Sequence, residues 1–272
     1  MPDTKEEQLF KERFRKKKRR ERFEKTGYFI LSFLILAFVW ELARATNLIN
    51  PKLFPSIKAV LNAFTVSFKS GSLQLHMYAS FLRVLTGFAI GITLAVIFGF
   101  LIGWFRILRL FLDPVINFFR ALPPIALIPL MIIFFGIGET SKVIVLSYAA
   151  FFPALVVIYQ ALVSLDPIYI RAGKTLGATS LETFRRIILP QLVPHIITAC
   201  RVSLGVCWAT LVAAELIAAQ RGIGAMMVDA QNFFQMAPLV LGILLIGAIS
   251  LLMDSMVRAI EKRATSWQEK MT

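Results

Sequence analysis

Six apolar runs, separated by short polar or basic segments, constrain this chain more than any other feature of its sequence. They cover residues 27–42, 84–105, 121–135, 143–165, 196–218 and 239–257. A helix needs about 20 apolar residues to cross the ~30 Å hydrocarbon core of a bilayer. With 57% hydrophobic residues, 17% charged residues and a mean hydropathy of +0.72, the chain has more apolar surface than a soluble core can bury. We therefore expect an all-α integral membrane protein with six transmembrane helices.

Lysine and arginine are unevenly distributed around these runs, which predicts an orientation. If the N-terminal tail is inside and the spans alternate, the inner segments hold 21 basic residues and the outer segments 6. Because basic residues beside a span stay on the cytoplasmic side, both termini are expected in the cytoplasm. The predicted organisation is a basic cytoplasmic tail (1–26), an anchor helix (27–45), a periplasmic segment (46–83), a five-helix core (84–258) with a cytoplasmic loop (166–194), and a cytoplasmic C-terminal tail (259–272).

The N-terminal tail holds eleven basic residues within its first 25, in a chain whose net charge is +14. Its place beside a span favours a positive-inside anchor, with binding to membrane lipid as the alternative, and it disfavours nucleic acid as a partner. The segment 43–45, Ala-Arg-Ala, imitates a small-residue cleavage site. The charged region before it is unusually long for a signal peptide, so we interpret the first span as uncleaved.

Cysteine and histidine give no sign of metal or redox chemistry. Cys200 and Cys207 lie in one apolar run, where packing as small hydrophobic residues is the simplest interpretation. His76 and His195 are far apart in sequence and belong to no cluster. We therefore expect no metal site.

The second apolar run carries a small residue at every fourth position. The stripe consists of Gly87, Gly91, Ala95, Gly99 and Gly103. Residues four apart lie on one helix face, and small residues there let another helix approach closely. The stripe is expected to be a helix-packing surface.

The third run is interrupted by Pro123, Pro124 and Pro129. Proline removes a backbone donor, and in a bilayer a broken backbone survives only inside protein or beside a water-filled cavity. The prolines therefore mark a candidate translocation path or gate, and a simple structural kink is the alternative.

Several charged residues fall within or at the ends of the spans, and four of them suggest a role. Glu215, late in the fifth run, could contact a gate or a substrate ammonium, but we interpret it as a hydrogen-bonded brace. Arg120, expected at the inner end of the third run, could attract an anion, although snorkelling to the interface is the simpler interpretation. Asp254 and Arg258 are spaced to form a local helix pair.

The cytoplasmic loop at 166–194 contains the most specific pattern in the chain. It reads Arg171-Ala172-Gly173-Lys174-Thr175-Leu176-Gly177, then nine residues, then Ile187-Ile188-Leu189-Pro190. The residues predict a short helix, a glycine break, a second helical stretch and a proline stop. Small residues at 172, 173 and 177 would let another protein approach, and an ordinary interfacial helix is the alternative.

This pattern resembles the loop of ABC importer permeases, which reads Glu-Ala-Ala, three residues, Gly, nine residues, Ile-x-Leu-Pro. Five positions match in residue and spacing: Ala172, Gly177, Ile187, Leu189 and Pro190. Arg171 replaces the usual Glu, and Gly173 replaces the second Ala. Further segments resemble the nitrate, sulfonate and taurine branch, taurine permeases most: 122–130 (LPPIALIPL), 135–142 (FGIGETSK), 208–217 (WATLVAAELI) and 221–224 (RGIG).

The resemblance implies a type I ABC importer permease fold and a loop that forms the coupling helix docked on an ATP-binding subunit. It also implies a second permease copy, in a homodimer, together with two ATP-binding subunits and a solute-binding protein. The substrate would be a small organic anion or zwitterion, taurine or another sulfonate favoured, with nitrate, bicarbonate or a small heterocycle as alternatives.

The sequence itself contains no complete Gly-x-x-x-x-Gly-Lys-Ser/Thr phosphate-binding loop, so ATP and Mg are expected on the partner ATPase and no cofactor on this chain. No convergent catalytic set supports an intramembrane enzyme, and the coupling-type loop argues against a channel.

Overall fold

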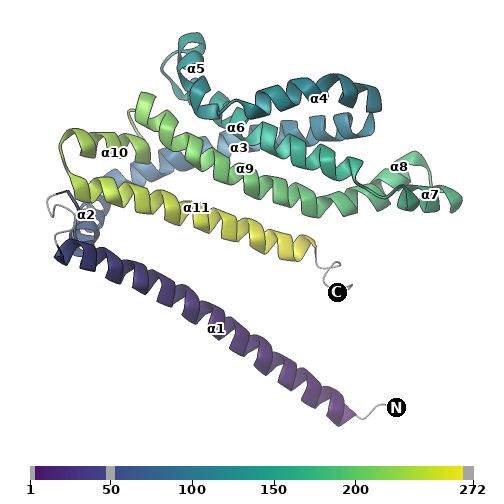
Figure 1. Ribbon diagram of the computed structural model, residues 1–272, viewed down its shortest axis with the longest axis horizontal. Helices are drawn as coiled ribbons and strands as arrows, with labels where there is room; N and C mark the ends of the chain where they lie inside the picture. The colour runs from purple at the N-terminus through teal and green to yellow at the C-terminus, as the bar shows by residue number, and fades with distance from the viewer. Residues whose placement is uncertain (1–3, 47–52, 266–272) are drawn as a thin grey trace. The chain divides into compact units, whose positions relative to one another are not determined.

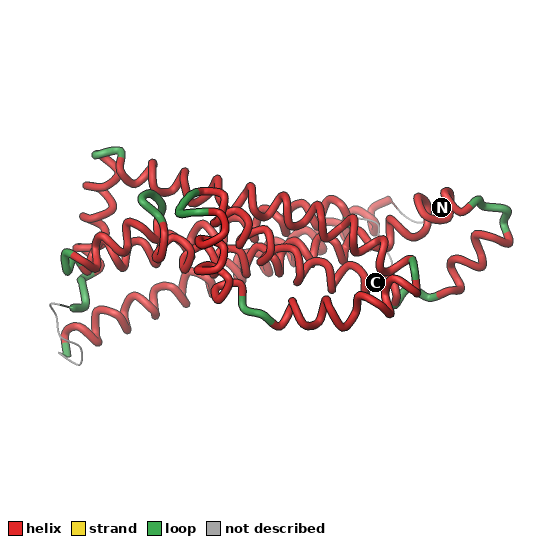
Figure 2. The backbone as a smooth tube through the Cα atoms, turned by 90° about the horizontal axis from the view of Figure 1, so that it is seen from above, coloured by secondary structure: helices red, strands yellow, loops and turns green. Residues whose placement is uncertain are grey.

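The computed structural model describes residues 4–46 and 53–265, and within these ranges it contains helices and no strand (Figures 1 and 2). The elements follow in this order: α1 (Thr4–Ala45), α2 (Ile57–Lys69), α3 (Ser72–Trp104), α4 (Arg106–Ala121), η1 (Pro124–Leu127), α5 (Ile128–Phe135), α6 (Glu139–Val163), α7 (Pro167–Thr175), α8 (Ser180–Thr183), the π-turn η2 (Phe184–Ile188), α9 (Leu189–Ala218), α10 (Ile223–Asn232) and α11 (Met236–Ala264).

Parts of three predicted segments lie outside the described residues: 1–3 of the basic tail, 47–52 of the periplasmic segment and 266–272 of the C-terminal tail. The rest of the basic tail continues the first span as one helix, α1. At the end of α1, Trp40 donates a hydrogen bond from Nε1 to the carbonyl of Pro55 at 3.0 Å, and Glu41 accepts one from the backbone N–H of Ile57 at 2.9 Å. The chain that follows α1 is thus tied back to its last turns. Residues 1–62 and 63–272 form separate compact units.

Five described helices are long and apolar enough to cross a membrane, and a sixth span results if α4 and the η1–α5 segment are counted together. The second of these, α3, begins at Ser72, well before the start at residue 84 that hydropathy predicts. A short helix, α10, separates α9 from α11 and was not predicted. The all-α expectation and the positions of the other long spans are confirmed.

The third predicted span, 121–135, is wrong as a single helix. Helix α4 ends at Ala121, and the η1–α5 segment leaves it at 85°. Leu122 adopts an extended backbone, as a residue before proline tends to. Pro123 and Pro124 then supply no N–H groups to continue the helix. The span is therefore broken, and α4, which was predicted as loop, forms its first half.

The small-residue stripe of α3 packs against α6, and this is the most extensive helix contact in the chain. A Cβ atom on Gly87 would lie 2.5 Å from Cβ of Leu146, and one on Gly91 would lie 2.5 Å from the carbonyl oxygen of Ser147. Gly103 meets Leu162 in the same way at the far end of the stripe. Glycine is required here because the two backbones approach too closely for any side chain.

Helix α9 lies along the other side of α6 and completes the core. Leu146 and Ala150 of α6 are buried against Cys207 and Leu211 of α9, and Ser203 donates a hydrogen bond to the carbonyl of Ala150 at 2.9 Å. Cys207 thus packs as a hydrophobic residue, as expected. The bundle has two ends: α7 and α8 lie at one, and α10 lies at the other (Figure 1).

An ion-pair network joins α9 to α11. Asp254 pairs with Arg258 at 2.7 Å, which confirms the predicted local pair. Asp254 also accepts from Arg201 of α9 at 3.0 Å, and Glu261 lies 3.3 Å from the same guanidinium. The intramembrane Arg201 is therefore neutralised by carboxylates from the neighbouring helix.

Candidate functional site

The segment between α6 and α9 folds through local hydrogen bonds. Asp166 caps α7 by accepting from the backbone N–H of Ile168 at 2.8 Å. At the other end of α7, Gly177 adopts a left-handed φ of 78°. The N–H of Gly177 donates to Lys174, and that of Ala178 donates to Gly173, both at 3.0 Å. This pair of bonds is a Schellman cap, which requires a left-handed residue where Gly177 stands.

The two halves of the sequence pattern meet in space. Gly173 is buried, and a Cβ there would lie 2.7 Å from Cδ1 of Ile187. Between them, Thr179 and Glu182 form a reciprocal capping box at the start of α8. Ile187 thus covers Gly173 and leaves little room for a side chain there. Gly173 serves packing within the segment and offers no surface to another protein.

The predicted proline stop is wrong. The helix runs from Ser180 to Ala218 and passes Pro190. Just before the proline, the chain widens into a π-turn in which the N–H of Leu189 donates to the carbonyl of Phe184. Proline donates no backbone hydrogen bond, and the wider turn before Pro190 leaves space for the proline ring. Leu189 and Pro190 therefore begin α9.

The segment exposes an apolar and basic surface. Leu176 is 88% exposed and Leu181 is 74% exposed, although both are large hydrophobic residues. Exposed basic side chains surround them: Arg171, Lys174, Arg185 and Arg186. Local bonds satisfy the backbone, so this surface remains available to a partner.

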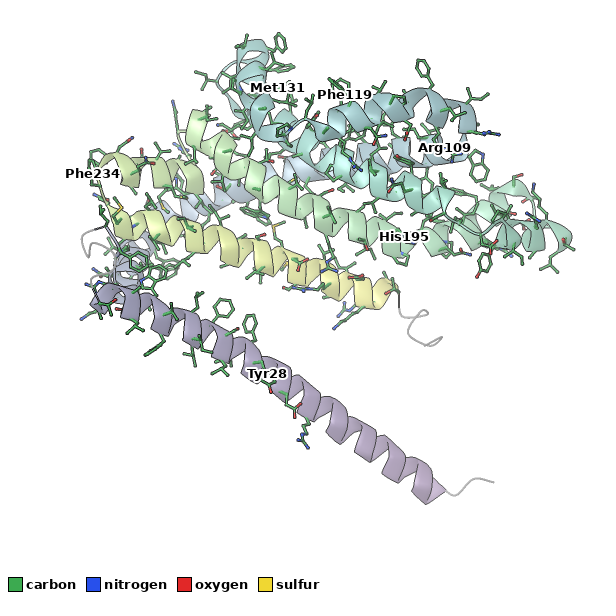
Figure 3. The ribbon with its side chains drawn as sticks, viewed as in Figure 1. Tyr28, Arg109, Phe119, Met131, His195 and Phe234 are labelled. Atoms are coloured by element: carbon green, nitrogen blue, oxygen red, sulfur yellow. The ribbon has the colours of Figure 1, made fainter. Side chains whose placement is uncertain are left out.

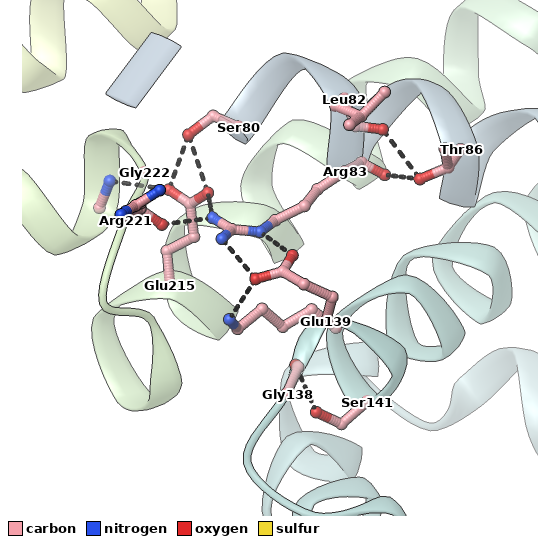
Figure 4. Close-up of polar contacts among 12 residues, drawn as sticks. Ser80, Leu82, Arg83, Thr86, Gly138, Glu139, Ser141, Glu215, Arg221 and Gly222 are labelled. Carbon is pink, nitrogen blue, oxygen red and sulfur yellow. Dashed lines mark hydrogen bonds and ion pairs between the residues drawn. The ribbon is translucent and has the colours of Figure 1, made fainter. Parts of the chain in front are cut away.

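At the opposite end of the bundle, charged residues from three helices meet (Figure 4). Arg83 of α3 donates to Glu215 of α9 at 2.6 Å, and to both carboxylate oxygens of Glu139 of α6 at 2.5 and 2.7 Å. Lys142 donates to Glu139 at 3.1 Å. We call Arg83, Glu139, Lys142 and Glu215 the charge cluster.

Glu215 is fully buried and its oxygens are occupied. Ser80 donates to it at 2.8 Å, and the N–H of Gly224 donates to it at 2.8 Å from the first turn of α10. A carboxylate at a helix N-terminus is further stabilised by the helix dipole. A Cβ on Gly222 would lie 2.3 Å from Oε1 of Glu215, so the turn before α10 must be glycine. The geometry is that of a brace joining α3, α9 and α10.

A cavity of about 780 Å³ opens beside the charge cluster. Its lining includes Tyr78, Leu82, Lys142, Ala218 and Arg221. Lys142 and Arg221, together with Arg83, outnumber the single lining carboxylate, Glu139. The cavity is therefore suited to water and small anions.

Hydropathy placed Arg83 and Lys142 in outer loops and gave them no role. One signal was available for Arg83: it precedes Gly87 by four residues and so continues the small-residue stripe toward α6. Its partners could not be found this way, because Glu215 is 132 residues away in sequence.

The three prolines lie at the break of the third span. Pro123 precedes η1, Pro124 begins it, and Pro129 lies in the first turn of α5. Each occupies a place where a missing N–H costs little. Pro123 and Pro129 are exposed and Pro124 is half-buried, so the break lies on the surface of the single chain.

Comparison with known proteins identifies the class to which this fold and these sites belong. Residues 87–266 match the family described as binding-protein-dependent transport system inner membrane component. The chain belongs to this family, and it is a permease subunit of an ABC importer, with ATP hydrolysis carried out by separate subunits.

Its relatives include a probable ABC transporter permease protein of Brucella abortus, which is 40% identical over 90% of this chain and 96% of its own length. The taurine transport system permease protein TauC of Escherichia coli is 36% identical over 86% of both chains. A putative aliphatic sulfonates transport permease protein, SsuC of Bacillus subtilis, is 30% identical over 94% of this chain and 93% of its own.

Two solved structures share the fold. A chain of the MetNI methionine ABC transporter, in an inward-facing conformation, aligns with a TM-score of 0.54 and 20% identity over 67% of this chain and 93% of that one. A chain of an amino acid ABC transporter with histidines aligns with a TM-score of 0.57 and 16% identity over 73% and 96%. The type I importer permease fold is thereby confirmed.

Proposed function

We propose that this chain forms the translocation pathway of a bacterial inner-membrane importer for a small organic sulfonate, with taurine as the favoured substrate. Relatives that carry taurine and aliphatic sulfonates in their names align over most of the chain. A nitrate import permease of Synechocystis is 26% identical over 88% of the chain, so nitrate is the second candidate. The cationic lining of the 780 Å³ cavity suits either anion.

The transporter consists of two copies of this chain, two ATP-binding subunits that hold ATP and Mg, and a solute-binding protein. The 21-to-6 distribution of basic residues supports a cytoplasmic location for both termini and for the α7 end. The charge cluster and the cavity then face the periplasm, where the solute-binding protein releases its ligand.

The observation that carries this function is the folded segment at 166–188. It holds the pattern residues Arg171, Ala172, Gly173, Gly177 and Ile187 in one local unit next to the start of α9, where Leu189 and Pro190 follow. Its exposed Leu176 and Leu181 form apolar surface of the kind that marks protein–protein contact sites. We infer that this unit is the coupling segment that binds the ATP-binding subunit.

The break at Pro123, Pro124 and Pro129 is proposed to line the pathway, because exposed irregular backbone needs water or protein around it. Glu215 is proposed to act as the brace beside this pathway. Its oxygens already bind Arg83, Ser80 and Gly224, which favours the brace over contact with substrate.

Docking is tested with Leu176→Asp in the complete transporter. Placing a carboxylate in an apolar pocket should reduce co-purification of the ATP-binding subunit and uptake by tenfold or more. Leu176→Met keeps the apolar contact and should behave as the unaltered chain. Normal co-purification with Leu176→Asp would show that the partner binds elsewhere.

The substrate is tested in host cells that lack their own taurine, sulfonate and nitrate importers. The chain is expressed with its ATP-binding and solute-binding partners, and uptake of labelled taurine and labelled nitrate is measured. Taurine uptake that excess nitrate does not reduce is expected. Uptake of nitrate alone would establish the second candidate.

A further inference from the structure

Helix α4 has two faces of opposite character. Polar residues recur along it at intervals of three or four and therefore share one face: Arg106, Arg109, Asp113, Asn117 and Arg120. The opposite face is apolar and exposed, with exposed fractions of 85%, 75% and 62% at Ile107, Phe111 and Phe118. An exposed apolar face suits lipid, so the polar face must find another environment.

Contacts with α6 show that α4 runs along the bundle. Asp113 accepts a hydrogen bond from the hydroxyl of Tyr159 at 2.9 Å. The ring of Phe119 stacks on that of Phe152 with 5.9 Å between centroids. Phe152 lies near the middle of α6, about 17–20 Å from either end at 1.5 Å per residue. The polar face of α4 therefore extends from the α7 end to mid-depth.

Arg120 stands at the deepest point of this face. Figure 3 labels Arg109 and Phe119 toward opposite ends of α4, and Arg120 directly follows Phe119. Arg120 thus lies at the corner where the span turns by 85°. Helix α4 thus carries Arg120 toward the middle of the bundle, farther from the α7 end than its place in the sequence suggested.

Arg120 also differs from the other deep arginines. Arg83 and Arg201 are each bound by two carboxylates, whereas Arg120 makes no ion pair in the part of the chain that the structure describes. An unpaired guanidinium at this depth is too costly in lipid and requires water or an anion. A guanidinium also binds carboxylates, sulfonates and other oxyanions through two parallel hydrogen bonds.

We propose that the polar face of α4 lines the inner half of the aqueous pathway and that Arg120 binds the anionic group of the substrate at mid-membrane. The substrate contact rests on the proposed function, since it requires an anionic or zwitterionic solute. The aqueous lining does not depend on which solute is carried.

The aqueous face is tested by thiol labelling of the complete transporter in membrane vesicles. In a chain with Cys200→Ala and Cys207→Ala, Arg120→Cys is compared with Phe118→Cys on the opposite face. A water-soluble methanethiosulfonate should label Arg120→Cys at least tenfold faster. Asn117→Cys, on the polar face, should follow Arg120→Cys and serves if the latter does not assemble. Equal rates on the two faces would overturn the pathway assignment.

The substrate contact is tested by uptake of labelled taurine into proteoliposomes containing the full transporter and its solute-binding protein. Arg120→Gln should lower uptake tenfold or more, while ATP hydrolysis stimulated by the solute-binding protein stays within twofold. Arg120→Lys should recover part of the uptake. Arg263→Gln, at an exposed arginine in the last turn of α11 and outside the proposed pathway, should change uptake less than twofold.

Unchanged uptake in Arg120→Gln, or an equal loss in Arg263→Gln, would overturn the assignment of Arg120. Failure of the unaltered transporter to carry taurine, with the labelling difference intact, would instead overturn the proposed substrate and leave the aqueous face supported.

Discussion

The two ends of the bundle are stabilised in different ways. At the α10 end, the charge cluster joins residues that are far apart in sequence, such as Arg83 and Glu215. At the α7 end, the coupling segment is held by bonds between near neighbours, including the Schellman cap at Gly177 and the capping box of Thr179 and Glu182. The charge cluster at the α10 end holds three helices together. The local bonds at the α7 end shape a short segment and leave its surface exposed.

This difference matches what each end must do in an importer. Buried ion pairs contribute little net stability but make separation of the partners costly, so the charge cluster holds α3, α6 and α9 in one arrangement. Local bonds shape this unit, and Ile170, Phe184 and Ile188 anchor it in the bundle, where the ring of Phe184 contacts that of Phe100 in α3. In the proposed docking, this anchored unit transmits motion of the ATP-binding subunit to α9, which begins where the unit ends.

The largest expected effect follows from removing Glu215. Glu215→Ala leaves the buried Arg83 without one of its carboxylates and removes the acceptor of Ser80 and Gly224. Breaking a buried pair in this way costs about 3–5 kcal/mol. Thermal unfolding of the detergent-purified transporter should show a marked loss of stability.

Glu139→Ala is the matched control at the same arginine, because the side chain of Glu139 is 63% exposed. Water can replace much of the charge stabilisation that Glu139 gives Arg83. The loss of stability in Glu139→Ala should therefore be clearly smaller than that in Glu215→Ala. Equal losses of stability in the two variants would mean that burial does not distinguish the two carboxylates. The contrast between the α10 end and the α7 end would then weaken.

A smaller loss of stability is expected from a change in the contact between the small-residue stripe of α3 and helix α6. Gly91→Ala places a Cβ 2.5 Å from the carbonyl oxygen of Ser147 and 2.6 Å from Cβ of Ala150. The backbones must separate, at a cost of about 1–3 kcal/mol. Gly247→Ala on α11 meets nothing within 4 Å, so it should leave unfolding unchanged or raise stability slightly.

The contact between α3 and α6 also shows what sequence alone can predict. Hydropathy predicted most of the long spans, and residue spacing predicted the stripe that includes Gly91 and the pairing of Asp254 with Arg258, since each depends on residues close in sequence. Spacing likewise located the glycine break at Gly177.

Features that depend on distant contacts could not be predicted. The partners of Arg83 come from two other helices, and nothing near Arg83 in sequence identifies them. The course of α4 was missed because its charges resembled a loop, although their spacing is helical. Pro190 was taken as a stop because the π-turn before it leaves no simple sequence signal.

The coupling segment itself is tested at Gly177, where φ is 78° and a Cβ would meet no other atom. Gly177→Leu therefore acts through the backbone, since a left-handed leucine costs about 1–2 kcal/mol. About 1.4 kcal/mol lost from docking reduces association tenfold, so uptake should fall about tenfold with normal membrane levels. Asparagine tolerates the left-handed conformation, so Gly177→Asn should lose much less uptake than Gly177→Leu.

Protein level, co-purified ATPase and uptake are measured in the same cells. Normal uptake by Gly177→Leu would show that the Schellman cap is not needed for coupling. Loss of the chain from the membrane would assign Gly177 to folding, and the two ends would then differ less than their hydrogen bonds suggest.

The smallest effect is expected at the capping box. Thr179→Ala removes the acceptor for the N–H of Glu182, at about 1 kcal/mol for a helix N-cap. Because α8 is exposed and locally bonded, the loss should stay within the coupling segment. Faster hydrogen exchange at residues 180–183, with an unchanged unfolding temperature of the bundle, is the expected result.

Glu182→Gln can still bond the N–H of Thr179 and serves as the control. A lowered unfolding temperature in Thr179→Ala would mean that the capping box contributes to the same cooperative unit as the charge cluster, contrary to the local effect that its short-range bonds predict.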